Sequence, residues 1–493
     1  MPWPIPGHLI LSPGVVQAML SDSIRNQDFH GGIEMSKTKW VVVITGLLVI
    51  TSVIGVRHSI QLLKDGAQAY LFGYSLVLMD TTRQSMTHSD HGKAPVNHFA
   101  HVRSFPDHKF RQVVRPNNDT LYSTAWINLT SEPVVLSVPD TEGRYYVMPF
   151  MDAWTNVFAS VGKRTTGTGP GNYLVAGPNW LGVLPEDTKL IRSPTNMIWL
   201  IGRIQTNTES DYSKVARLQS QIKLTPLSRW EKGEANQAFI TGDKPAQITS
   251  DNPSARVEKM SAGQFFAELS RLMGKYPPAA ADQPILKILA EFGVTPGKPF
   301  DINELGFLRR FLLQKAVGLA HNKLVEISAS DLSSENGWAV RRSGIGVYGT
   351  DYQVRAYVSL IGLGALTPKE AAYPNSKKDN EGNPLSGMHS YRIHFEAGKT
   401  PPVDAFWSLT VYDDLGFLIE NPIHRYMIGD RDNLTFNSDG SLDILIQHQQ
   451  PTGDTSNWLP APAETFAVTM RLYLPKAEFL DGRWKLPPIE RIN

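Results

Sequence analysis

Residues 124–148 read TAWINLTSEPVVLSVPDTEGRYYVM and contain three short runs of β-branched and aromatic residues. Turn-forming residues separate the runs, among them Pro139 with Asp140 and Glu142 with Gly143. Short strands at this spacing are typical of a β-sandwich. The stretch therefore predicts a β-sandwich within residues 58–205, preceded by a helix whose apolar residues recur at helical spacing. These apolar residues are Ile60, Leu63, Ala67, Tyr70, Leu71 and Tyr74.

The hydrophobic pattern changes to a helical period over residues 206–335. Ser261 and Gln264 have the spacing of a capping box, which opens a helix. Gly293 is expected to end a second, shorter helix. Asp301 and Glu304 are expected to open a third helix. The apolar residues expected in that third helix are Leu305, Leu308, Leu312 and Leu319.

Apolar residues alternate with polar ones in the C-terminal part, residues 386–493. This alternation predicts strands with one buried and one solvated face, as in antiparallel sandwiches and jelly rolls. A connecting helix and loop are expected over residues 336–385. The predicted fold class is therefore mainly β with a helical insert. The alternating residues are Tyr391, Ile393, Phe395, then Leu442, Ile444, Ile446, then Phe466, Val468, Met470 and Leu472.

The composition excludes several classes of protein. The chain has 493 residues, with 48 Lys and Arg against 47 Asp and Glu, so its net charge is +1. Such a balance argues against a nucleic-acid-binding protein. There is no cysteine, which excludes disulfides, zinc–thiolate sites, a thiol nucleophile and a cysteine lipid anchor. Stability must therefore come from hydrophobic cores, and the length suggests two to three domains.

Residues Trp40–Val56, WVVVITGLLVITSVIGV, form a long apolar run that follows Lys37 and Lys39. A basic segment before such a run predicts an export signal or an N-terminal transmembrane anchor over residues 35–57. A buried core helix is the alternative. We expect Met35 to be the initiator and residues 1–34 to be a spurious upstream extension. The predicted location is extracytoplasmic, in the periplasm or cell envelope, either secreted or anchored by one helix.

Two motifs suggest cofactors, and both have simpler explanations. Gly344, Gly346 and Gly349 match the dinucleotide fingerprint, but the residues before them are too few and too charged for a buried parallel strand. We interpret the motif as a glycine loop before a helix at 351–366. Five histidines lie close together, but Pro95 and Pro106 interrupt any helix there. These histidines are His88, His91, His98, His101 and His108. We predict no metal and no cofactor.

The densest polar cluster is RPNNDTLYS, residues 115–123. Arg115 is suited to gripping a carboxylate, and Asn118 and Tyr122 both donate and accept hydrogen bonds. These three residues are candidate ligand-binding residues, and Asp119 is a candidate catalytic residue. The alternative is a turn in which Asn118 and Asp119 satisfy backbone groups.

Other polar and aromatic residues add weaker candidates. Asp152, a second candidate catalytic residue, is expected to pair with Arg164, and Trp154 is a candidate platform for a sugar or ring. Structural pairing in a core is the alternative. In the C-terminal part His424 with Asp413 or Asp430 is a candidate general base, although a surface histidine explains it as well. Trp407, Arg164 and Arg425 complete the candidate ligand-binding residues.

Long stretches of the chain resemble two families of unknown function. RPNNDTLYSTAWINL, PDTEGRYYVMPFMDAWTNVFASVGKRTTGTGPGNYLVAGP and SPTNMIWLIGR resemble domain-of-unknown-function family 1254. SYRIHFEAGKTPPVDAFWSLTVYDDLGFLIENPIHRYMIGDRD and NWLPAPAETFAVTMRLYLPK resemble family 1214, its usual partner. The resemblance runs from about Gly73 to the C-terminus. It implies an exported protein with an immunoglobulin-like sandwich, intervening helices and a C-terminal jelly roll, and it implies no settled activity.

The same resemblance bears on the candidate residues. The matching polar positions are Arg115, Asn118, Asp119, Asp152, Arg164 and Arg425. His424 stands where the family commonly has Asn, so the resemblance gives no support to a shared histidine base.

Three functions fit these observations. The favoured one is binding of a polar small molecule or glycan in a cleft between two β lobes, which rests on fold analogy. The alternative is a metal-free hydrolase or lyase that uses Asp119 or Asp152 with arginine and tyrosine partners. A structural or assembly role in the cell envelope is the third. No nucleic-acid partner is expected, the membrane is a partner if Trp40–Val56 is retained, and a homo-oligomer stays open.

Overall fold

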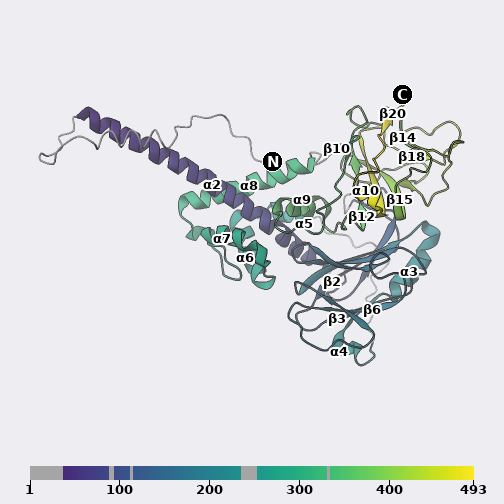
Figure 1. The fold of residues 1–493 in the computed structure, drawn as a ribbon, viewed down its shortest axis with the longest axis horizontal. Coiled ribbons are helices and arrows are strands. Elements are labelled where there is room, and N and C mark those ends of the chain that lie inside the picture. Colours follow the sequence, from purple (N-terminus) through teal and green to yellow (C-terminus); the bar gives the residue numbers. More distant parts are fainter. Residues whose placement is uncertain (1–36, 88–93, 112–114, 235–251, 330–333, 493) are drawn as a thin grey trace. The chain divides into compact units, whose positions relative to one another are not determined.

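The computed structural model describes residues 37–87, 94–111, 115–234, 252–329 and 334–492. The chain divides into two compact units, Met1–Ile60 and Gln61–Asn493. Helix α2, Lys37–Thr87, contains the described part of the first unit and the start of the second (Figure 1). The helix predicted before the first strands is therefore confirmed.

The N-terminal apolar run lies inside α2, but most of its side chains are outside the described residues. Within the part of the chain that the structure describes, no helix is both long and apolar enough to cross a membrane. The proposed upstream extension, residues 1–34, also lies outside the described residues. The export signal or anchor at Trp40–Val56 stays a prediction.

The strands described between residues 100 and 226 form two sheets that share a hydrophobic core. One sheet has the order β1-β2-β8-β4-β5, with strands Ala100–His101, Thr120–Asn128, Met197–Gln205, Tyr146–Asp152 and Val157–Gly162. The other has the order β7-β6-β3-β9, with strands Thr188–Arg192, Gly171–Ala176, Val134–Val138 and Lys223–Pro226. Leu121 and Leu200 from the first sheet join Leu136 and Tyr173 from the second in this core. We call these two sheets the N-terminal sheets.

Helices fill the middle of the sequence, as predicted. They are α3 Tyr212–Gln221, α4 Leu227–Trp230, α5 Pro253–Glu258, α6 Ala262–Lys275, α7 Gln283–Glu291, α8 Phe307–Ala329 and α9 Tyr352–Gly362. The capping box of Ser261 and Gln264 is present at the start of α6. Helix α2 packs on α6 and α8 through two glycines, since a Cβ on Gly73 would lie 2.5 Å from Leu269 and one on Gly66 would lie 2.8 Å from Ala316.

Helix α8 differs from the prediction in one respect. Leu305 lies before the helix begins, and Leu312 is buried in the helical core. Leu308 and Leu319 are exposed instead. The helix therefore buries only one side and leaves apolar residues on the other.

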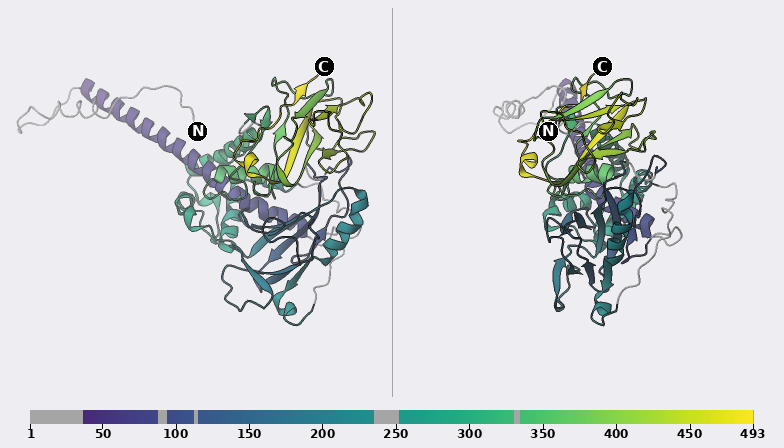
Figure 2. Two further views of the ribbon diagram at one scale, coloured as in Figure 1. Left: turned by 45° about the vertical axis from the view of Figure 1, so that its right-hand side comes forward. Right: turned by 90° about the vertical axis from the view of Figure 1, so that its right-hand side faces the viewer.

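The C-terminal part forms two further sheets. One has the path β10-β11-β13-β19-β15-β16, with β12 also paired to β19, and its strands are Ser334–Glu335, Trp338–Ala339, Asn375–Ser376, Phe466–Pro475, Val403–Asp413, Met427–Gly429 and Ala371–Ala372. The other is β18-β17-β14-β20, with strands Trp458–Pro460, Leu442–Gln447, Tyr391–Phe395 and Glu490–Arg491. A short helix, α10 Ala477–Leu480, follows β19. We call these the C-terminal sheets, and Figure 2 shows them from two further sides.

The C-terminal strands confirm part of the predicted alternation. Strand β14 alternates between buried and partly exposed residues, and β17 does the same. Strand β19 is buried at every residue, so the prediction that one of its faces is solvated is wrong. The second face of β19, which carries Thr469, Arg471 and Tyr473, is covered by residues that precede and begin β2. We call this contact the sheet junction.

Candidate functional site

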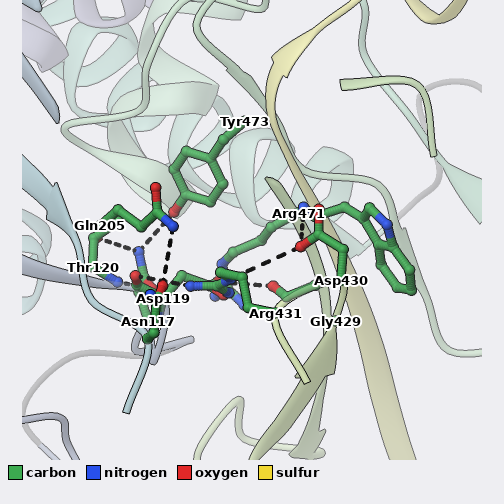
Figure 3. Close-up of polar contacts among 12 residues, drawn as sticks. Asn117, Asp119, Thr120, Gln205, Gly429, Asp430, Arg431, Arg471 and Tyr473 are labelled. Carbon is green, nitrogen blue, oxygen red and sulfur yellow. Dashed lines mark hydrogen bonds and ion pairs between the residues drawn. The ribbon is translucent and has the colours of Figure 1, made fainter. Parts of the chain in front are cut away.

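The ion pair between Asp119 and Arg431 lies in the sheet junction. Asp119 is fully buried, and its carboxylate accepts hydrogen bonds from Nη2 of Arg431 and from Oγ of Ser408 at 2.8 Å (Figure 3). Arg431 also donates to the carbonyl oxygens of Asp119 and Thr206, each at 3.3 Å. Both carboxylate oxygens of Asp119 are therefore occupied by the protein, and the pair joins the N-terminal sheets to the C-terminal sheets.

Asn117, a residue that the sequence analysis missed, organises the turn before Asp119. Its Oδ1 accepts from the backbone N–H of Asp119 at 2.5 Å and of Thr120 at 3.2 Å. Its Nδ2 donates to the hydroxyl of Tyr473 at 2.8 Å (Figure 3). The predicted turn role of the cluster is thus real, but it belongs mainly to Asn117. Asn118 donates to the Pro106 carbonyl at 2.8 Å.

Three arginines in the junction contact only neutral groups. Arg115 donates to Oδ1 of Asn375 and to Oγ1 of Thr469 at 3.3 Å. Arg203 donates to the carbonyl oxygens of Ile201 at 3.2 Å and Gly364 at 2.8 Å. No carboxylate among the described residues forms an ion pair with either side chain.

Arg471 is the third of these arginines. It donates to Oγ1 of Thr410 at 2.8 Å, to the Tyr412 hydroxyl at 2.5 Å and to the Arg115 carbonyl at 3.2 Å. It too has no carboxylate partner in an ion pair within the described ranges. Burial lowers the pKa of Arg115, and the charge of Arg471 lowers it further. We call Arg115, Arg203 and Arg471 the arginine cluster.

Two tyrosines accompany the arginine cluster. Tyr122 on β2 is paired with Arg203 on β8, and the guanidinium carbon lies 5.1 Å from the ring centroid. Burial alone would raise the pKa of Tyr122, but Arg203, Asn117 and Arg471 outweigh it and hold that pKa below its ordinary value. Burial raises the pKa of Tyr373 to about 12. Tyr122 is thus the phenol in the cluster that ionises more readily than usual.

The two parts of the junction differ in solvent access. Asp119, Ser408 and Arg471 are buried, whereas Arg115, Tyr122, Tyr373 and Asn375 are only half-buried. These four residues therefore keep some accessible surface next to an arginine cluster whose side chains form no ion pair with a described carboxylate.

The predicted pair between Asp152 and Arg164 is not formed. Arg164 instead donates to Oε2 of Glu370 at 2.6 Å, and Tyr145 donates to the other oxygen of Glu370 at 3.0 Å. These contacts also cross the sheet junction. The prediction was wrong because the partner of Arg164 lies far away in sequence.

Asp152 shapes a turn of its own. Its Oδ1 accepts from the backbone N–H of Trp154 at 2.9 Å and of Asn156 at 2.8 Å. Burial raises the pKa of Asp152 to about 6, against these hydrogen bonds and the charge of Arg355. Trp154 is buried and packs on Phe72 at 4.9 Å, so its ring is not available as a platform for a ligand.

The C-terminal candidates are used within the fold. Trp407 is buried and packs 5.4 Å from Phe395. Arg425 donates to the carbonyl oxygens of Thr455, Ser456 and Trp458 at 2.8–3.1 Å, which ties two loops together.

The predicted pairing of His424 is also not formed within the described structure. Arg111 donates to Asp413 at 2.9 Å, and Asp430 accepts from the Trp407 N–H at 3.2 Å (Figure 3 shows Asp430). His424 is exposed and contacts neither carboxylate.

The histidines between residues 88 and 108 do not gather where the structure describes them. His98 contacts the Val96 carbonyl, His101 contacts Ser123, and His108 contacts Tyr426. His88 and His91 lie outside the described residues. No group of three metal-binding side chains occurs in the described ranges.

The glycine motif is a loop, as predicted. Gly344, Gly346 and Gly349 all have positive φ, and helix α9 begins shortly after them at Tyr352. Only the two-residue strand β11 lies just before this loop. The arrangement is not that of a buried strand leading directly into a helix.

Comparisons with known families agree with this division of the chain. Residues 96–226 match DUF1254, a family of proteins of unknown function. Residues 370–477 match DUF1214, a second family of proteins of unknown function. The chain carries a DUF1254 and a DUF1214 domain. The junction of this DUF1254–DUF1214 protein is thus where the two family domains meet, with Asp119 and Arg203 in one and Arg431 and Arg471 in the other.

One solved structure has a similar fold. The VPA0106 protein from Vibrio parahaemolyticus is 25% identical, with a TM-score of 0.66, over 88% of this chain and 100% of that one. An uncharacterized protein from Burkholderia cenocepacia is 12% identical, with a TM-score of 0.43, over 89% of this chain and 96% of that one. No curated protein matches the chain.

Proposed function

We propose that this protein binds a small organic anion, with a carboxylate as the recognised group, at the arginine cluster. The observation that carries the proposal is the excess of positive charge: Arg115, Arg203 and Arg471 have only neutral partners among the described residues. Unpaired buried charges are costly, and a bound carboxylate would supply the missing counter-charge.

The residues around the cluster suit a carboxylate. The guanidinium group presents parallel N–H donors that match two carboxylate oxygens. Arg115 is half-buried beside the amide of the half-buried Asn375, and the half-buried Tyr122 adds a hydroxyl beside Arg203. A ligand could therefore reach Arg115 from the accessible side, while buried Arg203 and Arg471 contribute positive potential.

Asp119 is better suited to a structural role than to the hydrolase or lyase alternative. Its two oxygens are occupied by Arg431 and Ser408. A general base needs an oxygen within reach of substrate. We therefore favour binding over catalysis by Asp119.

The proposal also covers location and fold details. The basic residues before Trp40–Val56 favour export, with this run as a signal or as an anchor in the membrane. The N-terminal sheets would be an immunoglobulin-like sandwich and the C-terminal sheets a jelly roll. An extracytoplasmic location would place the anion site where it meets nutrients or envelope components.

The test is a thermal-shift and calorimetric comparison of organic acids with their uncharged amides and with neutral sugars. A ligand at 100 times its dissociation constant should stabilise the chain by about 2.7 kcal/mol. Arg115→Met should abolish the shift. Arg111→Met is the matched control, because Arg111 is an exposed arginine paired with Asp413.

The outcomes separate clearly. Stabilisation by acids that survives in Arg115→Met would refute this site. Equal stabilisation by amides or sugars would refute recognition of an anion and favour the neutral glycan that the sequence also allows.

A further inference from the structure

Helix α8 has an exposed apolar face that the anion site does not use. Phe307 is 76% exposed and Leu319 is 58% exposed, and Leu308 and Phe311 are exposed as well. Large apolar side chains grouped on one surface mark an interaction site more often than isolated ones do. We call these four residues with Gly318 the α8 face.

The residues of this face lie on one side of the helix. With 3.6 residues per turn, positions 307, 311 and 318 fall within a narrow arc, and 308 and 319 lie beside them. The opposite side packs into the core through Leu312, Leu313, Ala316, Ala320 and Leu324. Helix α8 is therefore apolar on two sides, and only one of them is covered by the described protein.

Basic residues outnumber acidic ones in helix α8. Helix α8 contains Arg309, Arg310, Lys315 and Lys323, and Glu326 is its one acidic residue. The Lys315 ammonium lies 5.7 Å from the centroid of the Phe311 ring, and the rings of Phe307 and Phe311 stack at 6.3 Å. Lysine thus stands at the edge of an aromatic surface.

We propose that the α8 face docks on an anionic phospholipid surface. Aromatic and aliphatic side chains on one side of a basic helix enter the headgroup region, while lysine and arginine attract anionic lipids. Charge argues against a second copy of this chain as the occupant. A twofold contact through this face would place the basic residues of both helices together, and each helix contains a single acidic residue, Glu326.

The position of α8 next to helix α2 also favours a membrane as the partner of the α8 face. Gly66 of α2 packs on Ala316 of α8, and Gly66 follows the end of the predicted signal or anchor run by only ten residues. The proposal does not depend on that run being retained, nor on the anion site, because it rests on the residues of α8 alone.

The absence of native cysteine makes a direct test simple. Gly318→Cys in the full chain would carry an environment-sensitive fluorophore, and a Cβ there meets nothing within 4 Å, so the substitution should be tolerated. Leu181→Cys is the control, since Leu181 is 95% exposed in the DUF1254 domain. Both labelled chains are measured in detergent and in vesicles of phosphatidylcholine with increasing phosphatidylglycerol.

The label at position 318 should shift to the blue in vesicles, more so with more phosphatidylglycerol, and should be quenched by spin-labelled lipid. Phe307→Ser with Phe311→Ser should reduce both effects, while the label at 181 stays unchanged. An unshifted label at 318 in vesicles would overturn the proposal. Equal shifts at both positions, or a shift that does not depend on anionic lipid, would also overturn it. A shift in detergent that grows with protein concentration would overturn it too and would indicate that a second copy of the chain covers the face.

Discussion

Two arginine environments lie side by side in the sheet junction, and they have opposite charge balance. Arg431 meets the carboxylate of Asp119, which is fully buried. Arg115 meets an amide and a hydroxyl, and it is half-buried. A paired and closed arginine is suited to holding two domains together, whereas an accessible arginine without a counter-ion is suited to binding an anion from outside.

The comparison predicts that removing a charge has different effects at the two places. At the closed pair, loss of Asp119 leaves Arg431 buried with only the longer contact to Asp430, at 3.9 Å. At the arginine cluster, loss of one cation relieves repulsion, because Arg471 already lowers the pKa of Arg115. Stability measurements and ligand measurements should therefore separate the two environments.

The largest expected effect is that of Asp119→Ala. The substitution removes the closest carboxylate from buried Arg431 and leaves only Asp430 at 3.9 Å. It should lower the free energy of unfolding by about 3–5 kcal/mol. Urea unfolding followed by circular dichroism would measure it. Replacing both partners, Asp119→Ala with Arg431→Met, should recover most of the loss because no charge is then stranded. A loss below about 1 kcal/mol for Asp119→Ala would contradict the structural role of the pair.

Asp152 sharpens the comparison, since it is a buried carboxylate in no ion pair of the described structure. Its pKa of about 6 lies above the ordinary 3.8, so the native state holds its proton more tightly than the unfolded state. The contribution of Asp152 to stability should therefore be fully present below about pH 4 and be lost as pH rises to about 6 and above, by about 3 kcal/mol in total.

The measurement is the difference in free energy of unfolding between wild type and Asp152→Asn across this pH range. The free energy of unfolding of Asp152→Asn should not show the decrease that Asp152 causes in wild type. Asp140→Asn, in an exposed turn, is the control and should keep the wild-type profile. Parallel profiles for wild type and Asp152→Asn would show that Asp152 does not titrate in this range.

Local sequence features predicted the individual elements well. The capping box at Ser261 and the alternation of β14 depend on residues that are close in sequence, and both are present. The prediction that β19 has a solvated face was wrong, because alternation of apolar and polar residues indicates only that one face is apolar. It does not report that another domain will cover the polar face.

The candidate site was predicted only in part. Arg115, Asn118, Asp119 and Tyr122 were found because they crowd one short segment. Their partners were missed because they are distant in sequence: Arg203 and Arg471 lie on β8 and β19, and Arg431 lies in the turn after β16. A usable signal did exist: Arg203 and Arg471 are each a lone charge within an apolar strand, MIWLIGRIQ and FAVTMRLYLP. A charge in such a strand must find a polar partner or a ligand.

Arg115→Met is a direct challenge to the comparison between the two arginines. Its free energy of unfolding should stay within about 1 kcal/mol of wild type, in either direction. Asn375 Oδ1 loses its bond from Arg115 but still accepts from Thr469 at 2.6 Å. Urea unfolding with and without an organic acid would show unchanged stability and a lost ligand effect. A loss as large as that of Asp119→Ala would mean that Arg115 is structural too.

The smallest expected effect concerns Tyr122. Its lowered pKa means that it ionises below the ordinary value of 10 and then supplies the arginine cluster with a negative charge of its own. A bound anion competes with that charge, so anion affinity should fall as pH rises through the pKa of Tyr122, by about twofold at half ionisation. Calorimetry between neutral pH and about pH 10 would follow this fall. Tyr122→Phe should bind with no such dependence, and Tyr212→Phe, outside the cluster, should behave as wild type. If affinity in Tyr122→Phe still fell like wild type, another group would be the competing anion, and the accessible side of the arginine cluster would have to be assigned to different residues.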